Sequence, residues 1–84
     1  MTIEEQIKEF ISRDLLFSPG NFPYNDDDSF LDRGIVDSIG IMMLVLFIEE
    51  SFKLGVEDWE ITPMNFDSVA HLAGYVRCKI KVDV

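Results

Sequence analysis

The stretch DSIGIMMLVLFIEESF, residues 37–52, decides the fold of this chain. Its first residue, Asp37, is a favoured helix N-cap, because an aspartate side chain accepts the free backbone N–H groups of a first turn. Apolar residues then recur at helical spacing. Gly55 comes shortly afterwards, and glycine is common just past helix ends. We therefore predict a helix from Ser38 to about Phe52.

The predicted helix has two apolar faces. One face has the spacing of a stripe that packs on a core, and it consists of Ile41, Leu44, Val45, Ile48 and Phe52. The second face consists of Ile39, Met42, Met43, Leu46 and Phe47. A helix in a small bundle seldom buries its whole circumference, so we expect part of the second face to be exposed. Two interpretations stay open: a central, mostly buried helix, or a docking face on which methionines adapt to several partners.

The N-terminal segment predicts an earlier helix. Thr2 and Glu5 have the spacing of a capping box, in which each side chain binds a free backbone N–H. The core stripe expected behind them consists of Ile3, Ile7, Phe10 and Ile11. Ser18-Pro19-Gly20 predicts the end of this helix, because proline disfavours a helical residue before it and glycine is a poor helix former after it.

The sequence of residues 18–37 indicates a long connection between these two helices. Loops of this length without structure of their own are uncommon in compact domains and are usually functional. We expect an ordered connection with a brief helical turn at Ser29–Leu31. The side chains expected to pin it to the core are Phe22, Tyr24, Phe30, Leu31 and Ile35.

Two further helix starts lie near the C-terminus. Thr62-Pro63 combines a capping residue with proline at the first helical position, and it predicts a short helix ending by Phe66. Asp67 is predicted to cap the last helix. The core stripe expected in that helix is Val69, Leu72, Ala73, Val76 and Ile80. The cations expected at its C-terminal end, where they suit the helix dipole, are Lys79 and Lys81.

The sequence as a whole predicts one all-α domain over residues 1–84. We expect a four-helix bundle with three longer helices, one short helix and a long ordered loop between the first helix and the second. A chain of 84 residues builds only one modest core. A deep enzyme cleft is hard to fit beside such a core, so we expect a protein that other enzymes act on.

The charge of the chain limits its partners. Sixteen acidic residues against seven basic residues give a net charge of -9. Nucleic-acid phosphates and anionic membranes repel a chain of this sign. The longest apolar run, residues 41–48, is far shorter than the about 20 residues that span a bilayer. We expect protein partners with basic patches and no membrane insertion.

The cysteine content and the N-terminus bear on the compartment. Cys78 is the only cysteine, which excludes an intrachain disulfide and a thiolate zinc site and fits a reducing cytoplasm. Glu4 and Glu5 occupy the place where a signal peptide has basic residues. We expect a cytoplasmic monomer without a metal site.

Three stretches together resemble one known family. Residues 31–39, LDRGIVDSI, resemble the attachment motif of acyl carrier proteins and of the related carrier domains of polyketide and peptide synthetases. The centre of that motif, Asp-Ser-Leu, reads here Asp37-Ser38-Ile39. Residues 48–52 resemble the family's end of helix two, and residues 66–69 resemble the start of its last helix. The similarity covers essentially the whole chain in order, including the long first loop.

The resemblance implies a specific function. Ser38 would receive a 4′-phosphopantetheine arm from coenzyme A, added by a phosphopantetheinyl transferase that uses magnesium. The arm would carry acyl intermediates as thioesters for enzymes of fatty-acid, lipid or specialised acyl and polyketide biosynthesis. Asp37 would help the transferase to engage. The residues expected to meet the loading and transfer enzymes are Ile39, Met42, Met43, Leu46, Glu49 and Glu50.

Two positions depart from the family pattern. Typical fatty-acid carriers have acidic residues early on the outer face of helix two, where this chain has Gly40 and Met43. Glycine at such a position weakens a helical turn by roughly 1 kcal/mol relative to alanine. The more apolar face favours a specialised carrier that serves a dedicated pathway.

Other interpretations of single residues fit the sequence less well. A hydrolase with Ser38 as nucleophile and His71 as base lacks the first glycine of a nucleophile elbow. Calcium binding at residues 26–37 fails the EF-hand pattern, which leaves a solvated acidic loop. Trp59 is expected to be a core or surface-packing residue and Cys78 an idle helix residue. The remaining competitor is a cofactor-free acidic adaptor that binds proteins through the apolar face of the helix over residues 38–52.

Overall fold

A computed structural model describes the backbone of residues 1–82 and the side chains of residues 1–80. Within this part of the chain every regular element is helical, so the prediction of an all-α domain is confirmed at the level of a small helical bundle. The elements in chain order are α1 (Ile3–Phe10), η1 (Ile11–Leu15), α2 (Ser38–Phe52), η2 (Asp58–Glu60), α3 (Pro63–Phe66) and α4 (Val69–Val82). The predicted role of Lys81 concerns a side chain outside the described residues.

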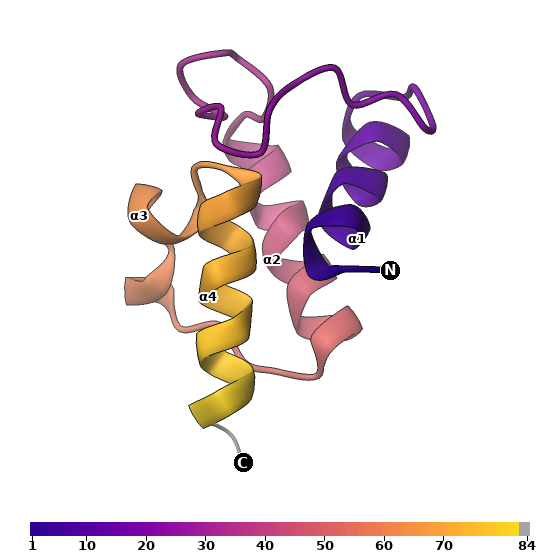
Figure 1. The fold of residues 1–84 in the computed structure, drawn as a ribbon. Helices are drawn as coiled ribbons and strands as arrows, with labels where there is room; N and C mark the ends of the chain where they lie inside the picture. Colours follow the sequence, from indigo (N-terminus) through magenta and orange to yellow (C-terminus); the bar gives the residue numbers. More distant parts are fainter. Residues whose placement is uncertain (83–84) are drawn as a thin grey trace.

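The three longer helices lie side by side beneath the long connection between η1 and α2. α2 and α4 both begin at the end of the bundle that this connection covers, whereas α1 runs toward that end (Figure 1). The short helix α3 lies beside α4. No helix in residues 1–82 is long and apolar enough to cross a membrane.

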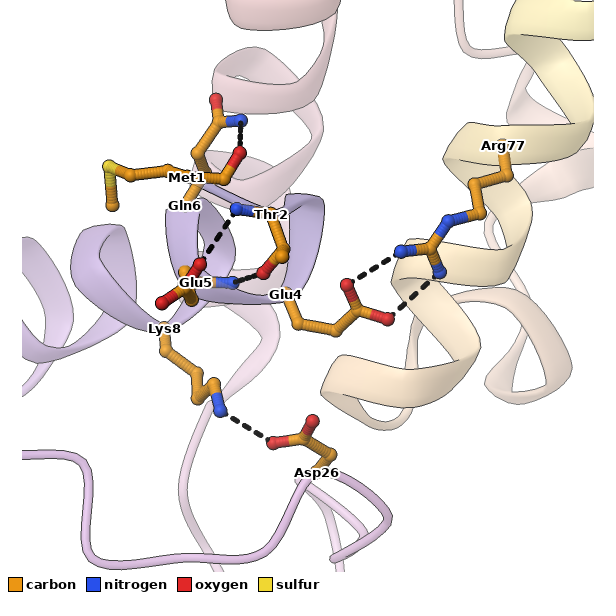
Figure 2. Close-up of polar contacts among 8 residues, drawn as sticks. All are labelled: Met1, Thr2, Glu4, Glu5, Gln6, Lys8, Asp26 and Arg77. Carbon is orange, nitrogen blue, oxygen red and sulfur yellow. Dashed lines mark hydrogen bonds and ion pairs between the residues drawn. The ribbon is translucent and has the colours of Figure 1, made fainter.

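α1 begins with the capping box that the sequence predicts. The Glu5 backbone N–H donates to Thr2 Oγ1 at 3.1 Å, and the Thr2 N–H donates to Glu5 Oε1 at 2.8 Å (Figure 2). The helix then continues into η1, a π-helical turn closed by the bond from the Leu16 N–H to the Ile11 carbonyl at 2.9 Å. Helical geometry ends at Leu15, shortly before the predicted stop at residues 18–20.

Two ion pairs connect α1 to its neighbours. Arg77 on α4 donates two hydrogen bonds to the Glu4 carboxylate, at 2.7 and 2.8 Å, and these bonds lower the pKa of Glu4 (Figure 2). Lys8 Nζ lies 2.9 Å from an Asp26 carboxylate oxygen in the long connection. Exposed pairs of this kind contribute at most about 1 kcal/mol each, so they orient α1 more than they stabilise it.

The core combines all three longer helices with the long connection. The side chains with no exposed surface are those of Ile7, Ile11, Phe30, Leu44, Ile48, Val69, Leu72, Ala73 and Val76. The predicted core stripes are therefore largely confirmed, with two exceptions. Leu31 is exposed because the turn it belongs to directs Phe30 and Ile35 inward instead. Ile80 is partly exposed because α4 extends past the other helices at its C-terminal end (Figure 1).

The long connection is ordered and contains the predicted helical turn. The Arg33 N–H donates to the Ser29 carbonyl at 3.0 Å, and the turn closes with bonds from Gly34 to Leu31 and from Ile35 to Phe30. Gly34 has a φ of 64°, which is a left-handed conformation. A residue in this conformation commonly follows a helical segment that closes with such hydrogen bonds. Glycine suits the position because it adopts positive φ without steric cost.

The cap of α4 differs from the prediction. Ser68 Oγ accepts the His71 N–H at 3.0 Å and caps the helix, not Asp67. The Asp67 carboxylate instead accepts the Ser29 hydroxyl at 2.5 Å and the Leu31 N–H at 3.1 Å. This carboxylate therefore ties the long connection to the start of α4. Its role depends on Ser29, which lies 38 positions away in the sequence.

The bounds of α2 agree with the prediction, but its C-terminal end is formed differently. Lys53, with a φ of 55°, takes the left-handed position that the sequence pattern favoured for Gly55. Glu49 Oε2 accepts the Val56 N–H at 3.0 Å and holds the segment after the helix.

Candidate functional site

Ser38 is the first residue of α2 and its side chain is exposed. Asp37 precedes it as the N-cap, in the extended conformation that caps require, and Asp37 Oδ1 accepts the Gly40 N–H at 2.8 Å. The hydroxyl therefore lies at the positive end of the α2 dipole, next to backbone N–H groups of a first turn. This arrangement presents one serine outward on a fixed helix end.

Gly40 fits its place in the structure closely. It is buried, and a Cβ atom at this position would lie 2.6 Å from Val36 Cγ1 and 3.3 Å from Asp37 Oδ1. A contact of 2.6 Å between carbon atoms is far inside their optimal separation of about 3.5 Å. Glycine is thus what lets residues 36–37 pack directly against the first turn of α2, and this contact fixes the segment beside Ser38.

The outer face of α2 carries an apolar strip. Four side chains form it, which we call the outer strip: Ile39, Met42, Met43 and Leu46, exposed by 73%, 52%, 37% and 63%. On the opposite face Leu44, Val45 and Ile48 are buried. The prediction that part of the second face is exposed is confirmed, and α2 is not a fully buried central helix.

Phe47 is the member of the second apolar face that packs inward. Its ring stacks on Phe10 of α1 with the centroids 4.4 Å apart, and it meets Phe52 edge-on at 6.2 Å. Phe47 therefore belongs to the contact between α1 and α2 and not to the outer strip.

Phe17 extends the apolar surface beyond α2. Its side chain is 84% exposed, and its φ of 54° is the left-handed conformation, which is unfavourable for a residue with a bulky side chain. Between η1 and the start of α2 lies a hollow of about 300 Å³, lined by Asp14, Leu15, Phe17, Gly34, Ile35, Val36, Asp37, Ile39, Gly40 and Met43. Both sequence neighbours of Ser38 thus line an apolar-walled hollow.

The two acidic residues at the end of α2 differ in their surroundings. Glu50 is exposed, whereas Glu49 is half-buried and engaged with the Val56 N–H. The predicted partner-binding pair therefore contains one free carboxylate and one that already has a structural role. The outer strip itself carries no charge.

A second, smaller hollow separates α2 from α3. It measures about 140 Å³ and is mostly apolar, and its lining residues are Leu31, Ile41, Ile61, Thr62, Pro63, Phe66 and Asp67. Ile41 lies one turn beyond Ser38 on α2, so this hollow and the first one lie on either side of the helix start.

A partly buried charged cluster, which we call the Glu60 cluster, joins η2 to Tyr75 and Lys79 of α4, and the sequence pattern did not predict it. The Glu60 carboxylate accepts the Glu57 N–H at 3.0 Å, the Tyr75 hydroxyl at 3.0 Å and Lys79 Nζ at 3.1 Å. These bonds lower the pKa of Glu60, and burial together with Glu60 raises the pKa of Tyr75. Tyr75 and Lys79 are four residues apart on α4, a spacing that places them on one helix face and is the only sequence signal for this cluster.

The residues named in the other interpretations are exposed or have partners of their own in the described part of the chain. His71 is exposed on α4, and its backbone N–H binds Ser68. Among the described residues no group of three potential ligands comes together to hold a metal ion. In the acidic loop, Asp26 pairs with Lys8, and Asp28 accepts the Asn25 N–H. Trp59 is 76% exposed and is therefore not a core residue, and Cys78 is exposed as well.

Comparison with known protein-family models and with curated proteins finds no match to this chain.

Proposed function

We propose that this chain is a carrier protein that holds acyl groups as thioesters on a 4′-phosphopantetheine arm attached to Ser38 Oγ. The observation that carries the proposal is the exposed Ser38 at the first position of α2, behind the N-cap Asp37 and beside the outer strip. The resemblance of residues 31–39, 48–52 and 66–69 to acyl carrier proteins agrees with it. No activity of the chain's own is required, because the chemistry belongs to partner enzymes.

The surroundings of Ser38 fit the attachment of such an arm. The hydroxyl is exposed, so a transferase can reach it, and the phosphate that it would carry is an anion at a helix N-terminus, where the dipole favours negative charge. In the attachment reaction Ser38 Oγ forms a bond to the phosphorus of the pantetheine phosphate, adenosine 3′,5′-bisphosphate leaves coenzyme A, and the hydroxyl proton passes to the transferase. The bound arm supplies a terminal thiol for acyl groups.

The N-cap bond gives Asp37 a role that supports this reaction. By accepting the Gly40 N–H, the Asp37 carboxylate fixes the first turn and hence the direction of the neighbouring Ser38. Recognition of Asp37 by the transferase belongs to the proposal, and the exposure of this side chain is compatible with it.

The outer strip is the proposed docking face for the loading and transfer enzymes. Buried apolar area is the main favourable term in most protein association, and exposed apolar clusters of this kind mark interaction sites. Because Glu49 is engaged with Val56, Glu50 is the free carboxylate that this end of α2 offers to basic partners. A mostly apolar face with one acidic residue is the basis for proposing that the carrier serves a dedicated pathway and not general fatty-acid synthesis. The proposal also includes a cytoplasmic location and a monomeric state.

Intact-mass measurement tests the attachment. The protein is incubated with coenzyme A, magnesium and a broad-specificity phosphopantetheinyl transferase, and we expect a gain of one phosphopantetheine. Ser38→Ala should abolish the gain. Ser51→Ala is the matched control, because Ser51 is also an exposed serine of α2, and it should gain the full mass. Absence of a gain in the wild type, or a gain in Ser38→Ala, would refute the proposal.

The second candidate function is a cofactor-free adaptor that binds proteins through the outer strip. The exposure of Ile39, Met42 and Leu46 favours it as much as it favours a docking carrier. The same mass experiment separates the two, since an adaptor has no use for a modified serine. If Ser38 stays unmodified while substitutions in the outer strip abolish binding of a partner, the adaptor is the correct function.

A further inference from the structure

Phe17 is a large apolar residue without a packing role in the core. Its ring is 84% exposed, and its φ of 54° is a conformation that glycine adopts at lower cost. The bond from the Ser18 N–H to the Ser12 carbonyl, at 2.7 Å, fixes the turn that contains it. A bulky side chain held at such a position points to a contact outside the chain.

Two hollows follow the line along which α1 and η1 lie beside α2. The first, of about 300 Å³, is lined in part by Phe17 and Ile39, and the second, of about 390 Å³, is lined in part by Leu46. Asp14 and Met43 line both hollows, so the two form one continuous groove. We call it the α1–α2 groove, and its accessible apolar wall consists of Leu15, Phe17, Ile39, Met43 and Leu46.

The α1–α2 groove has a carboxylate at each end and apolar side chains between them. Asp37, the N-cap of α2, lines one end, and Glu50 lines the other. Both are exposed, and they are 13 positions apart, which is about 20 Å along a helix. Among the described residues that line the groove the cation is Arg13, which is already bonded to Asp14 and Glu9. The free charge of the groove is therefore negative at both ends.

The walls of the α1–α2 groove favour a helix over an extended peptide. Within residues 1–82 every regular element is helical, so the groove has no strand edge with which a peptide backbone could pair. An extended peptide would leave its N–H and C=O groups without partners there, whereas a helix satisfies them internally. Ile39 and Leu46 are about 10 Å apart along α2. Residues i, i+4 and i+7 of a docked helix cover the same length.

We propose that the α1–α2 groove binds an amphipathic helix of a partner protein, with apolar residues at i, i+4 and i+7 and a lysine or arginine beyond each end of that stripe. Charge selects this occupant, because its cations meet Asp37 and Glu50. A second copy of the chain would bring the same carboxylates and repel. The groove stands on the residues of this chain, whereas assigning the helix to a loading or transfer enzyme rests on the proposed function.

Titration of the unmodified protein with a synthetic peptide tests the groove without assuming a function. The probe has leucines at i, i+4 and i+7 and a lysine beyond each end, on a background of alanine and glutamine. We expect saturable chemical-shift changes at the methyl groups of Met43 and Leu46 but not of Met64 on α3, and weaker binding at higher salt. A peptide of the same composition, with the leucines spread around the helix, should bind at least about tenfold more weakly.

Phe17→Gly removes the aromatic ring without endangering the fold. Glycine adopts a φ of 54° at no steric cost, so the melting temperature should at least equal that of the wild type. We expect this variant to bind the probe peptide about tenfold more weakly, the scale of removing an aromatic anchor from an interface. Met64→Ala is the matched control, because it truncates a similarly exposed apolar side chain outside the groove, and it should bind as the wild type does.

Three results would overturn the proposed helix site: no saturable binding, equal binding of the two peptides, or equal affinity of Phe17→Gly and the wild type. Sedimentation of the free protein as a dimer that Phe17→Gly dissociates would also overturn it, because the groove would then belong to a second copy.

The modification of Ser38 decides separately which partner owns the helix. If Ser38 takes no arm, the proposed function fails and the peptide result stands. If the arm is attached, turnover of Phe17→Gly by the native loading enzyme should fall, whereas Met64→Ala should be turned over as the wild type is. Unchanged turnover of Phe17→Gly would refute the assignment of the helix to that enzyme.

Discussion

The outer strip of α2 and the Glu60 cluster reverse the usual placement of residues in a small globular protein. The strip leaves Ile39, Met42 and Leu46 largely exposed to water, whereas the cluster encloses a carboxylate against Tyr75 and Lys79. Exposed apolar side chains forgo the free energy of burial, and a buried carboxylate requires hydrogen bonds in place of water.

The difference between these regions teaches what each is suited for. The outer strip has no internal partner, so its apolar surface is free for another molecule. The Glu60 cluster has every partner it needs within the chain, and it fixes a segment instead of binding a ligand. A docking face and a positioning contact can therefore be separated experimentally by substitutions that affect one and spare the other.

The largest expected effect comes from comparing the two faces of α2. Ile48→Ala should lower the free energy of unfolding by about 2–5 kcal/mol, because it leaves a cavity in the closed core. Leu46→Ala, on the outer strip of the same helix, should change it by no more than about 0.5 kcal/mol. Urea unfolding followed by circular dichroism measures both. Similar losses in the two variants would mean that the outer strip is structural.

A smaller effect on stability is expected at Gly40, in the first turn of α2. Gly40→Ala should destabilise the protein by about 1–3 kcal/mol, because the new Cβ would meet Val36 Cγ1 at 2.6 Å. On helix propensity alone the same change would stabilise by about 1 kcal/mol, so the sign of the result decides between packing and propensity. Urea unfolding measures it, and a more stable Gly40→Ala protein would contradict the described contact.

The Glu60 cluster should make stability depend on pH on the acid side. The pKa of Glu60 is lowered in the folded protein, mainly by the Glu57 N–H, with Lys79 and Tyr75 adding to the effect. The contribution of this carboxylate to the free energy of unfolding is therefore complete above the usual carboxyl pKa. It is lost as the pH falls through the lowered pKa of the folded protein.

Comparing variants isolates this contribution from those of other acids, including Glu4, whose pKa is also lowered. The melting temperature of Glu60→Gln should fall less steeply between neutral and acid pH than that of the wild type. Asp58→Asn should keep the wild-type slope. Parallel curves for Glu60→Gln and the wild type would show that Glu60 has no such role.

The smallest effect on stability is expected from a charge placed on the strip. Met43→Glu should leave the unfolding free energy within about 0.5 kcal/mol of the wild type, since the side chain is partly exposed. Modification of Ser38 should also persist, while turnover with the native loading enzyme should change, because a carboxylate replaces apolar contact surface. Unchanged turnover in a steady-state assay would count against the docking face.

Local patterns in the sequence predicted most of the helix limits. The Thr2–Glu5 capping box, the Asp37 cap and the Thr62-Pro63 start depend on residues a few positions apart, and all three helix starts are found where expected. The two faces of α2 were predictable for the same reason, because helical spacing alone assigns residues to a face.

Contacts between distant residues account for the features that the sequence did not predict. Aspartate is a favoured capping residue, but the Asp67 carboxylate accepts the Ser29 hydroxyl, and Ser68 caps α4 instead. Glu60 has no local sequence signal for burial, and only the fold brings Tyr75 and Lys79 to it. The close approach of Val36 that requires glycine at position 40 likewise has no local signal.

The most direct test of the central claim is the mass of the protein isolated from the cells that make it. Tandem mass spectrometry of the peptide that contains residues 37–39 should show a phosphodiester-linked pantetheine on Ser38, with or without an acyl group on its thiol. Recovery of this peptide only in unmodified form, or with the arm on another residue, would contradict the account.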